Sequence, residues 1–136
     1  MIKPIVRDMM FLSRTSDKAT LADKQVINDL LDTLNAHLDG CVGMAANMIG
    51  YRKNIIIVAT GFADIVMINP VITDRSEPYE AEEGCLSLPG TRKTTRYKNI
   101  TVSYQDKKFA KHTQAFTGYL AQIIQHECDH LAGILI

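Results

Sequence analysis

The sequence carries, at residues 126–130, the pattern His126-Glu127-Cys128-Asp129-His130. Residues four apart lie on one face of a helix, so His126 and His130 can bind one metal ion while Glu127 reaches a water molecule on it. The alternative is a solvated helix in which two histidines happen to lie four residues apart. A metal site therefore needs a third ligand from elsewhere in the chain.

A helix is expected around this pattern, beginning after Thr117, which can cap its first turn, and ending at Gly133. Its apolar residues recur at helical spacing and are Leu120, Ile123, Ile124 and Leu131. A second amphipathic helix is expected from about Thr20, its cap, to Leu38, with Gly40 at its exit. Its apolar stripe consists of Ile27, Leu30, Leu31, Leu34 and Leu38.

The segment between these helices has the pattern of strands. The β-branched runs Ile55–Val58 and Ile65–Ile68, the second closed by Asn69-Pro70, predict two buried strands. Ile100–Tyr104 alternates apolar and polar residues and predicts another strand, followed after a turn by one near Phe109–Phe116. The order of helix, strands and helix predicts an α+β fold.

Composition limits the possible partners. A chain of 136 residues is expected to form a single domain over residues 1–136. It has 15 basic and 15 acidic residues, which argues against a basic surface that binds nucleic acid. The longest purely apolar run, Ile55–Ala59, is too short to span a membrane, and the first residues do not resemble a secretory signal. We therefore expect a cytoplasmic protein with no nucleic-acid or membrane partner; the oligomeric state stays open.

A candidate third ligand stands in the segment Glu83-Gly84-Cys85-Leu86-Ser87. A thiolate from Cys85 with two imidazoles leaves one tetrahedral position open, as a catalytic site requires. The alternative is a buried free cysteine beside a turn. Cys128 lies two residues from each histidine, about 200° around the helix, so it is predicted to be a core thiol.

Two segments, residues 83–87 and Gln125–His130, together resemble the second and third signature motifs of the peptide deformylases. The first motif of that family, G-x-G-L-A-A-x-Q, is similar to Cys41-Val42-Gly43-Met44-Ala45-Ala46-Asn47-Met48, and the resemblance extends over almost the whole chain. It implies an α+β, peptide deformylase-like fold, with small mixed or antiparallel sheets packed around a C-terminal metal-binding helix.

The resemblance also implies a reaction. Cys85, His126 and His130 are expected to hold one divalent metal ion, usually Fe²⁺ in the family, with Zn²⁺ or Ni²⁺ able to replace it. Glu127 is expected to act as general base and then as acid in removing the N-formyl group from formyl-methionyl peptides or nascent chains, which releases formate. In the family the oxyanion is stabilised by the metal, by the backbone N–H that corresponds to Leu86, and by the glutamine of the first motif.

Further residues take expected roles from the same resemblance. The substrate backbone is expected along Gly43 and Gly84, and the methionine side chain in a pocket formed by Val42, Tyr119 and Ile123. Arg96 is expected to brace Glu83, although two surface charges are the alternative. Gln125 and Asp129 are expected to orient the ligating histidines.

The match fails at two positions of the first motif. Met48 replaces the glutamine that donates to the oxyanion, and a thioether has no hydrogen to donate. The amide of the adjacent Asn47 could replace it only after a local backbone change, and Cys41 adds a side chain where the family has glycine. We therefore expect a deformylase-like hydrolase with reduced or altered activity. The alternatives are a non-catalytic homologue that binds metal and peptide N-termini, and a metal-free α+β domain.

Overall fold

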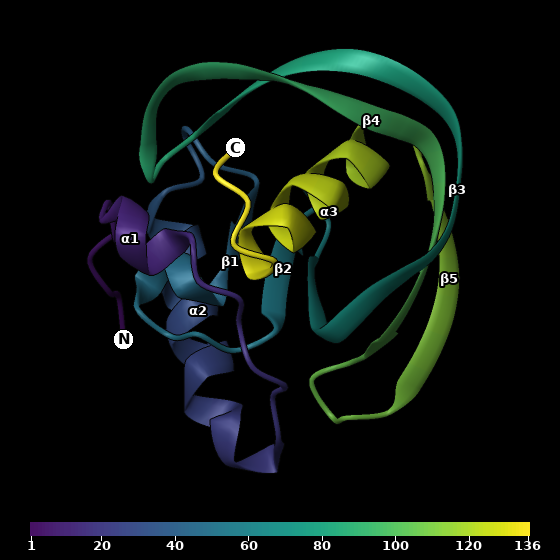
Figure 1. The fold of residues 1–136 in the computed structure, drawn as a ribbon. Coiled ribbons are helices and arrows are strands. Elements are labelled where there is room, and N and C mark those ends of the chain that lie inside the picture. Colours follow the sequence, from purple (N-terminus) through teal and green to yellow (C-terminus); the bar gives the residue numbers. More distant parts are fainter.

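The structure is a computed structural model that describes residues 1–136. A five-stranded sheet, in the order β1-β2-β3-β4-β5 with every neighbouring pair antiparallel, curves around the last helix, α3 (Figure 1). The strands are β1 Gly43–Ala45, β2 Ile55–Ala59, β3 Asp64–Cys85, β4 Leu88–Gln105 and β5 Lys111–Thr117. The α-helices are α1 Met9–Leu12, α2 Lys24–Ala36 and α3 Gly118–Leu131, and two 3-10 turns span Leu21–Asp23 and Ala46–Ile49. This arrangement confirms the predicted α+β class.

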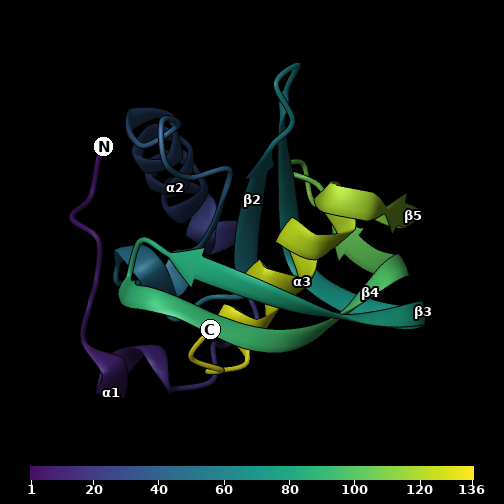
Figure 2. The ribbon, with the colours of Figure 1, turned by 90° about the horizontal axis from the view of Figure 1, so that it is seen from above.

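Two helices pack on opposite sides of the first strands. Figure 2 shows α2 on one side of β2 and α3 on the other, with the long β3–β4 hairpin passing around α3. The apolar faces of these elements form one core cluster of 25 buried residues. No helix has both the length and the apolar character needed to cross a membrane.

The helix predicted from Thr20 to Leu38 is confirmed in its centre and corrected at its ends. Thr20 caps a 3-10 turn, in which its side chain accepts from Ala22 N–H and Asp23 accepts from the Thr20 N–H. The α-helix α2 follows and ends at Ala36, so Leu38 lies beyond it and is 48% exposed. Including Leu38 in the core stripe was therefore wrong.

The predicted end of a strand at Asn69-Pro70 was also wrong, because β3 continues to Cys85. Asn69 has a positive φ of 51°, and the pairing with β4 shifts in register before it resumes at Val71. The Asn69 amide fixes this irregular point by donating to the Ala19 carbonyl oxygen and to Gln105 Oε1 at 3.0 Å each. Beyond it, β3 is mostly exposed, so it has no apolar run that a sequence pattern could detect.

The last helix begins where the sequence predicted. Thr117 has extended backbone angles, and α3 follows from Gly118, although the Thr117 side chain makes no capping hydrogen bond. The buried face of α3 includes Ile123, Ile124 and both motif histidines, because the curved sheet covers this face. The sheet therefore brings the end of β3 against the two histidines of α3.

Candidate active site

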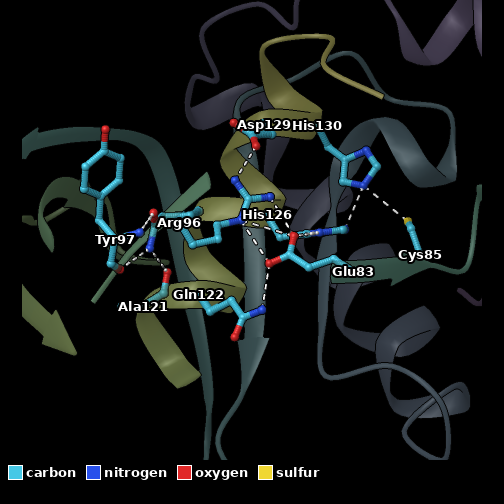
Figure 3. Close-up of polar contacts among 10 residues, drawn as sticks. Glu83, Cys85, Arg96, Tyr97, Ala121, Gln122, His126, Asp129 and His130 are labelled. Carbon is cyan, nitrogen blue, oxygen red and sulfur yellow. Dashed lines mark hydrogen bonds and ion pairs between the residues drawn. The ribbon is translucent and has the colours of Figure 1, made fainter. Parts of the chain in front are cut away.

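Three potential metal ligands meet where the end of β3 contacts α3. Cys85 is the last residue of β3, while His126 and His130 lie one turn apart on α3 (Figure 3). His130 Nε2 lies 3.2 Å from Cys85 Sγ and 3.2 Å from His126 Nε2. All three candidate ligand atoms lie within 4.8 Å of one another.

This donor set fits a divalent metal ion. A tetrahedral ion with bonds of about 2.0–2.3 Å holds neighbouring ligand atoms about 3.3–3.8 Å apart, close to the spacing found here. A hydrogen bond from His126 Nδ1 to the ionised Glu83 keeps a proton on Nδ1, so Nε2 is the atom that would bind an ion once its own proton is released. Burial, reinforced by the nearby His126, lowers the pKa of His130 to about 3, so its imidazole is neutral as a ligand requires.

Glu83 orients His126 from a buried carboxylate. Glu83 Oε1 lies 2.9 Å from His126 Nδ1 and accepts from Arg96 Nη2 at 2.7 Å. Burial alone would raise the pKa of Glu83, but hydrogen bonds from His126, Arg96 and Gln122 lower it to about 2. Glu83 and Arg96 are only 8% and 3% exposed, so the alternative of two solvated surface charges is wrong.

The structure corrects the roles expected for Gln125 and Asp129. Asp129 Oδ2 accepts from Arg96 Nη1 at 2.6 Å and so anchors the arginine that holds Glu83. Gln125 binds the backbone of Tyr97, accepting from its N–H at 2.9 Å and donating to its carbonyl oxygen at 2.8 Å. Neither side chain makes a hydrogen bond to a histidine, because both are directed toward β4.

Glu127 lies next to the three candidate ligands with an unsatisfied carboxylate. It is 4% exposed, and its Oε1 has no hydrogen-bond partner. Burial, together with the charge of Glu83, raises the pKa of Glu127 to about 7 against the opposing effect of His126. A carboxyl group with a pKa near neutrality can both accept and return a proton.

A pocket with a volume of about 510 Å³ opens onto these groups. Its wall contains every residue that the sequence assigned to substrate or oxyanion, namely Val42, Gly43, Met48, Gly84, Leu86, Tyr119 and Ile123. Cys85, His126 and Glu127 complete the wall, so a ligand in the pocket lies beside the candidate metal position.

Gly43 of β1 lies directly against the pocket residues of α3. A Cβ at this position would lie 2.6 Å from Ile123 Cγ2 and 3.0 Å from Glu127 Oε2. Real Cβ atoms do not pack at the shorter of these distances, so a larger residue would displace Ile123 or Glu127. Glycine here lets β1 pack directly against the α3 residues of the pocket.

The divergent first motif lies in the same wall. Met48 is 1% exposed, and its Sδ accepts from the Ala45 N–H at 3.4 Å, so it offers the pocket no donor. The Asn47 amide donates to the His130 carbonyl oxygen at 2.7 Å and does not replace the missing group. Cys41 lines the pocket, and its thiol donates to the Gly43 carbonyl oxygen at 2.8 Å.

Gln122 is a pocket residue that the sequence did not indicate. It lies one turn before His126 on α3, lines the pocket, and donates from Nε2 to Glu83 Oε2 at 2.8 Å. The sequence does show that Gln122 lies four residues before His126 and therefore on the same face of the helix. This spacing indicates a shared partner only once the fold has placed Glu83 beside both residues.

Comparisons with known proteins agree with this geometry. The sequence profile of a family described as polypeptide deformylase matches residues 3–136. The chain is 56% identical over 136 residues to a peptide deformylase of Clostridium beijerinckii, with 100% of both chains covered. It is similar in structure to the peptide deformylase of Thermotoga maritima, with a TM-score of 0.89, 32% identity, and coverage of 99% of this chain and 95% of that one. A Met-Ala-Ser-bound class I type b peptide deformylase from Acinetobacter baumannii has a TM-score of 0.89 at 28% identity, with 99% and 97% coverage.

Proposed function

Because this chain belongs to the polypeptide deformylase family, we propose that it hydrolyses the N-formyl group of formyl-methionyl peptides and releases formate. The observation that carries the proposal is the unpartnered carboxylate of Glu127 beside the converging Cys85, His126 and His130. A site that only bound metal would not need a buried, unsatisfied acid at this position. Residues 1–136 would act as one domain around the single core cluster.

In this proposal Cys85, His126 and His130 hold a divalent ion. Such an ion polarises a carbonyl group and lowers the pKa of water. Glu127 accepts a proton from the attacking water, which adds to the formyl carbon. It then returns a proton to the departing nitrogen as the C–N bond breaks, so one amide and one water give a free amine and formate.

The pocket supports a peptide with an apolar first side chain. Val42, Tyr119 and Ile123 supply its apolar wall, and Gly43 and Gly84 leave room for a backbone. The backbone N–H of Leu86, next to Cys85, is the proposed donor to the developing oxyanion. The Acinetobacter baumannii relative was solved with Met-Ala-Ser bound, which is the kind of product that this reaction leaves.

We propose Fe²⁺ as the native ion, with Zn²⁺ or Ni²⁺ able to replace it. One thiolate and two imidazoles suit all three of these borderline ions, so the donor set is compatible with the family's usual metal. Metal analysis of anaerobically purified protein would identify the ion. Cys85→Ala should lose it; a Cys85→Ala variant that retained stoichiometric metal would contradict the ligand assignment.

We further propose that turnover is reduced because Met48 provides no oxyanion donor. Removal of one preorganised donor typically costs about 10²–10³-fold in turnover, so Met48→Gln should raise formate release by a factor of that order. The assay is formate release from a formyl-Met-Ala-Ser peptide under anaerobic conditions, with both proteins loaded with the same metal. A matched control is Met44→Gln, which alters a buried methionine of the same motif outside the pocket wall.

The outcomes separate the candidate functions. Rapid turnover by the unaltered protein would show a working deformylase that needs no donor at residue 48. Low turnover with a large gain in Met48→Gln would support the reduced-activity proposal. No formate from either protein would favour the alternative, a homologue that binds metal and peptide N-termini without catalysis. The cytoplasmic location expected from the sequence stays a prediction.

A further inference from the structure

Gln122 faces both the pocket and the carboxylate that holds His126. It is half-buried on α3, on the wall that also includes Tyr119 and Ile123. Its Nε2 donates to Glu83 Oε2 at 2.8 Å, and Figure 3 shows its amide oxygen pointing away from Glu83. One side chain therefore connects the substrate pocket to a residue behind the metal site.

The hydrogen bonds of Glu83 give Gln122 a distinct position. Glu83 Oε1 is shared by His126 Nδ1 at 2.9 Å and Arg96 Nη2 at 2.7 Å. Arg96 Nε lies between the two oxygens, at 3.1 Å from Oε1 and 3.0 Å from Oε2. Gln122 is the one donor that bonds Oε2 alone. Together with Arg96, its hydrogen bond therefore fixes the rotation of the carboxylate, which in turn fixes the direction in which Oε1 meets His126.

The orientation of the Gln122 amide is fixed by the same contact. The Glu83 carboxylate accepts hydrogen bonds from Arg96 and His126 and presents Oε2 as an acceptor 2.8 Å from Gln122 Nε2. The NH₂ group of Gln122 must therefore face Glu83. A ligand in the pocket would contact the Gln122 side chain, which cannot turn without losing its hydrogen bond to Glu83.

We propose that Gln122 is a positioning residue that couples the side-chain pocket to the orientation of His126 through Glu83. The proposal rests on the proposed function and adds a residue to it. A first side chain that fills the pocket packs against Gln122 and holds its amide on Glu83. Part of the binding energy of that side chain then orients a metal ligand, which raises kcat in addition to lowering KM.

Metal affinity gives a test that does not depend on turnover. Gln122→Met keeps the length and unbranched shape of the side chain but removes the donor. Mutation of a residue that orients a metal ligand typically lowers metal affinity by about 10–100-fold. Because Gln122 acts indirectly, through Glu83, we expect the lower end of this range, about tenfold weaker binding of Zn²⁺. The measurement is competition for Zn²⁺ between the metal-free protein and a chromophoric chelator, with circular dichroism to verify folding.

Tyr119→Leu is the matched control, because Tyr119 lies on the same pocket wall but makes no hydrogen bond with Glu83. It should bind Zn²⁺ as the unaltered protein does. Zn²⁺ affinity of Gln122→Met within about twofold of the unaltered protein would overturn the proposal. An equal loss in Tyr119→Leu would overturn it as well, because the effect would then belong to the pocket wall in general.

The coupling itself is tested with two substrates, formyl-Met-Ala-Ser and formyl-Ala-Ala-Ser. In the unaltered protein the methionine side chain should raise kcat as well as lower KM. In Gln122→Met the advantage in kcat should fall several-fold while the advantage in KM remains. Equal losses of kcat for both peptides would refute coupling. If neither protein releases formate, the proposed function fails, and the Zn²⁺ measurement still decides the role of Gln122.

Discussion

Arg96→Leu should destabilise the protein strongly, because Arg96 neutralises two carboxylates at once. The guanidinium donates to Glu83 at 2.7–3.1 Å and to Asp129 at 2.6 Å. Removal of one partner of a buried ion pair typically costs about 3–5 kcal/mol. Glu83 would keep His126 and Gln122 as partners, and the Asp129 side chain is 25% exposed and can turn to water, so we expect about 3 kcal/mol, the lower end of that range.

The assay is urea denaturation followed by circular dichroism, with a chelator present so that metal binding does not add to the free energy of unfolding. With an m-value of about 1–3 kcal/mol per molar urea, a loss of about 3 kcal/mol lowers the midpoint by roughly 1–3 M. Lys93→Leu, an exposed basic residue of the same strand, is the control and should change the midpoint little.

The result that would refute this reasoning is a loss below about 1 kcal/mol, the value typical of exposed ion pairs. A second variant separates two causes of the loss of stability. One is the lost attraction between Arg96 and Glu83, and the other is the cost of leaving the Glu83 charge buried without Arg96. Adding Glu83→Leu to Arg96→Leu removes that charge, so the double variant should recover part of the lost stability. A double variant less stable than Arg96→Leu by several kcal/mol would show that the cost lies in lost packing.

Three further outcomes follow from the site. Glu127→Gln should lower formate release by at least about 10²-fold while retaining the metal; loss of metal would contradict its assignment as a proton carrier and not a ligand. Gly43→Ala should cost about 1–3 kcal/mol in urea denaturation because the new methyl group meets Ile123, whereas Gly40→Ala, with no atom within 4 Å, should leave stability unchanged. Burial raises the pKa of Cys128 to about 12, which favours the unreactive thiol at pH 8; iodoacetamide should label it roughly a thousandfold more slowly in the native than in the unfolded protein, and equal rates measured by mass spectrometry would contradict this.

Local patterns predicted much of the fold because they reflect burial of one face. The stripe of α2 and the runs in β2 and at the start of β3 are apolar for this reason. The rest of β3 and the first half of β4 pair mainly with each other and are largely exposed. Their position depends on backbone hydrogen bonds between distant residues, which leave little trace in composition.

Two of the candidate ligands were predictable because helical spacing alone brings His126 and His130 together, whereas Cys85 was assigned through the resemblance to the deformylase motifs. The supporting residues depend on which strand α3 packs against, and no local pattern contains that information. Gln125 was therefore assigned to a histidine although it binds the backbone of Tyr97. Gln122 was missed for the same reason, since its partner Glu83 comes from β3.

The register of β3 against β4 restricts how this chain can change length during evolution. Glu83 pairs with Arg92 and Tyr79 with Arg96, and successive side chains of a strand alternate between faces. A single-residue insertion between Arg92 and Arg96 would move the Arg96 guanidinium to the opposite face, away from Glu83, unless a bulge absorbed it. Insertions and deletions among descendants of this sequence should therefore be tolerated in the exposed turn at residues 60–63 and be rare within this hairpin.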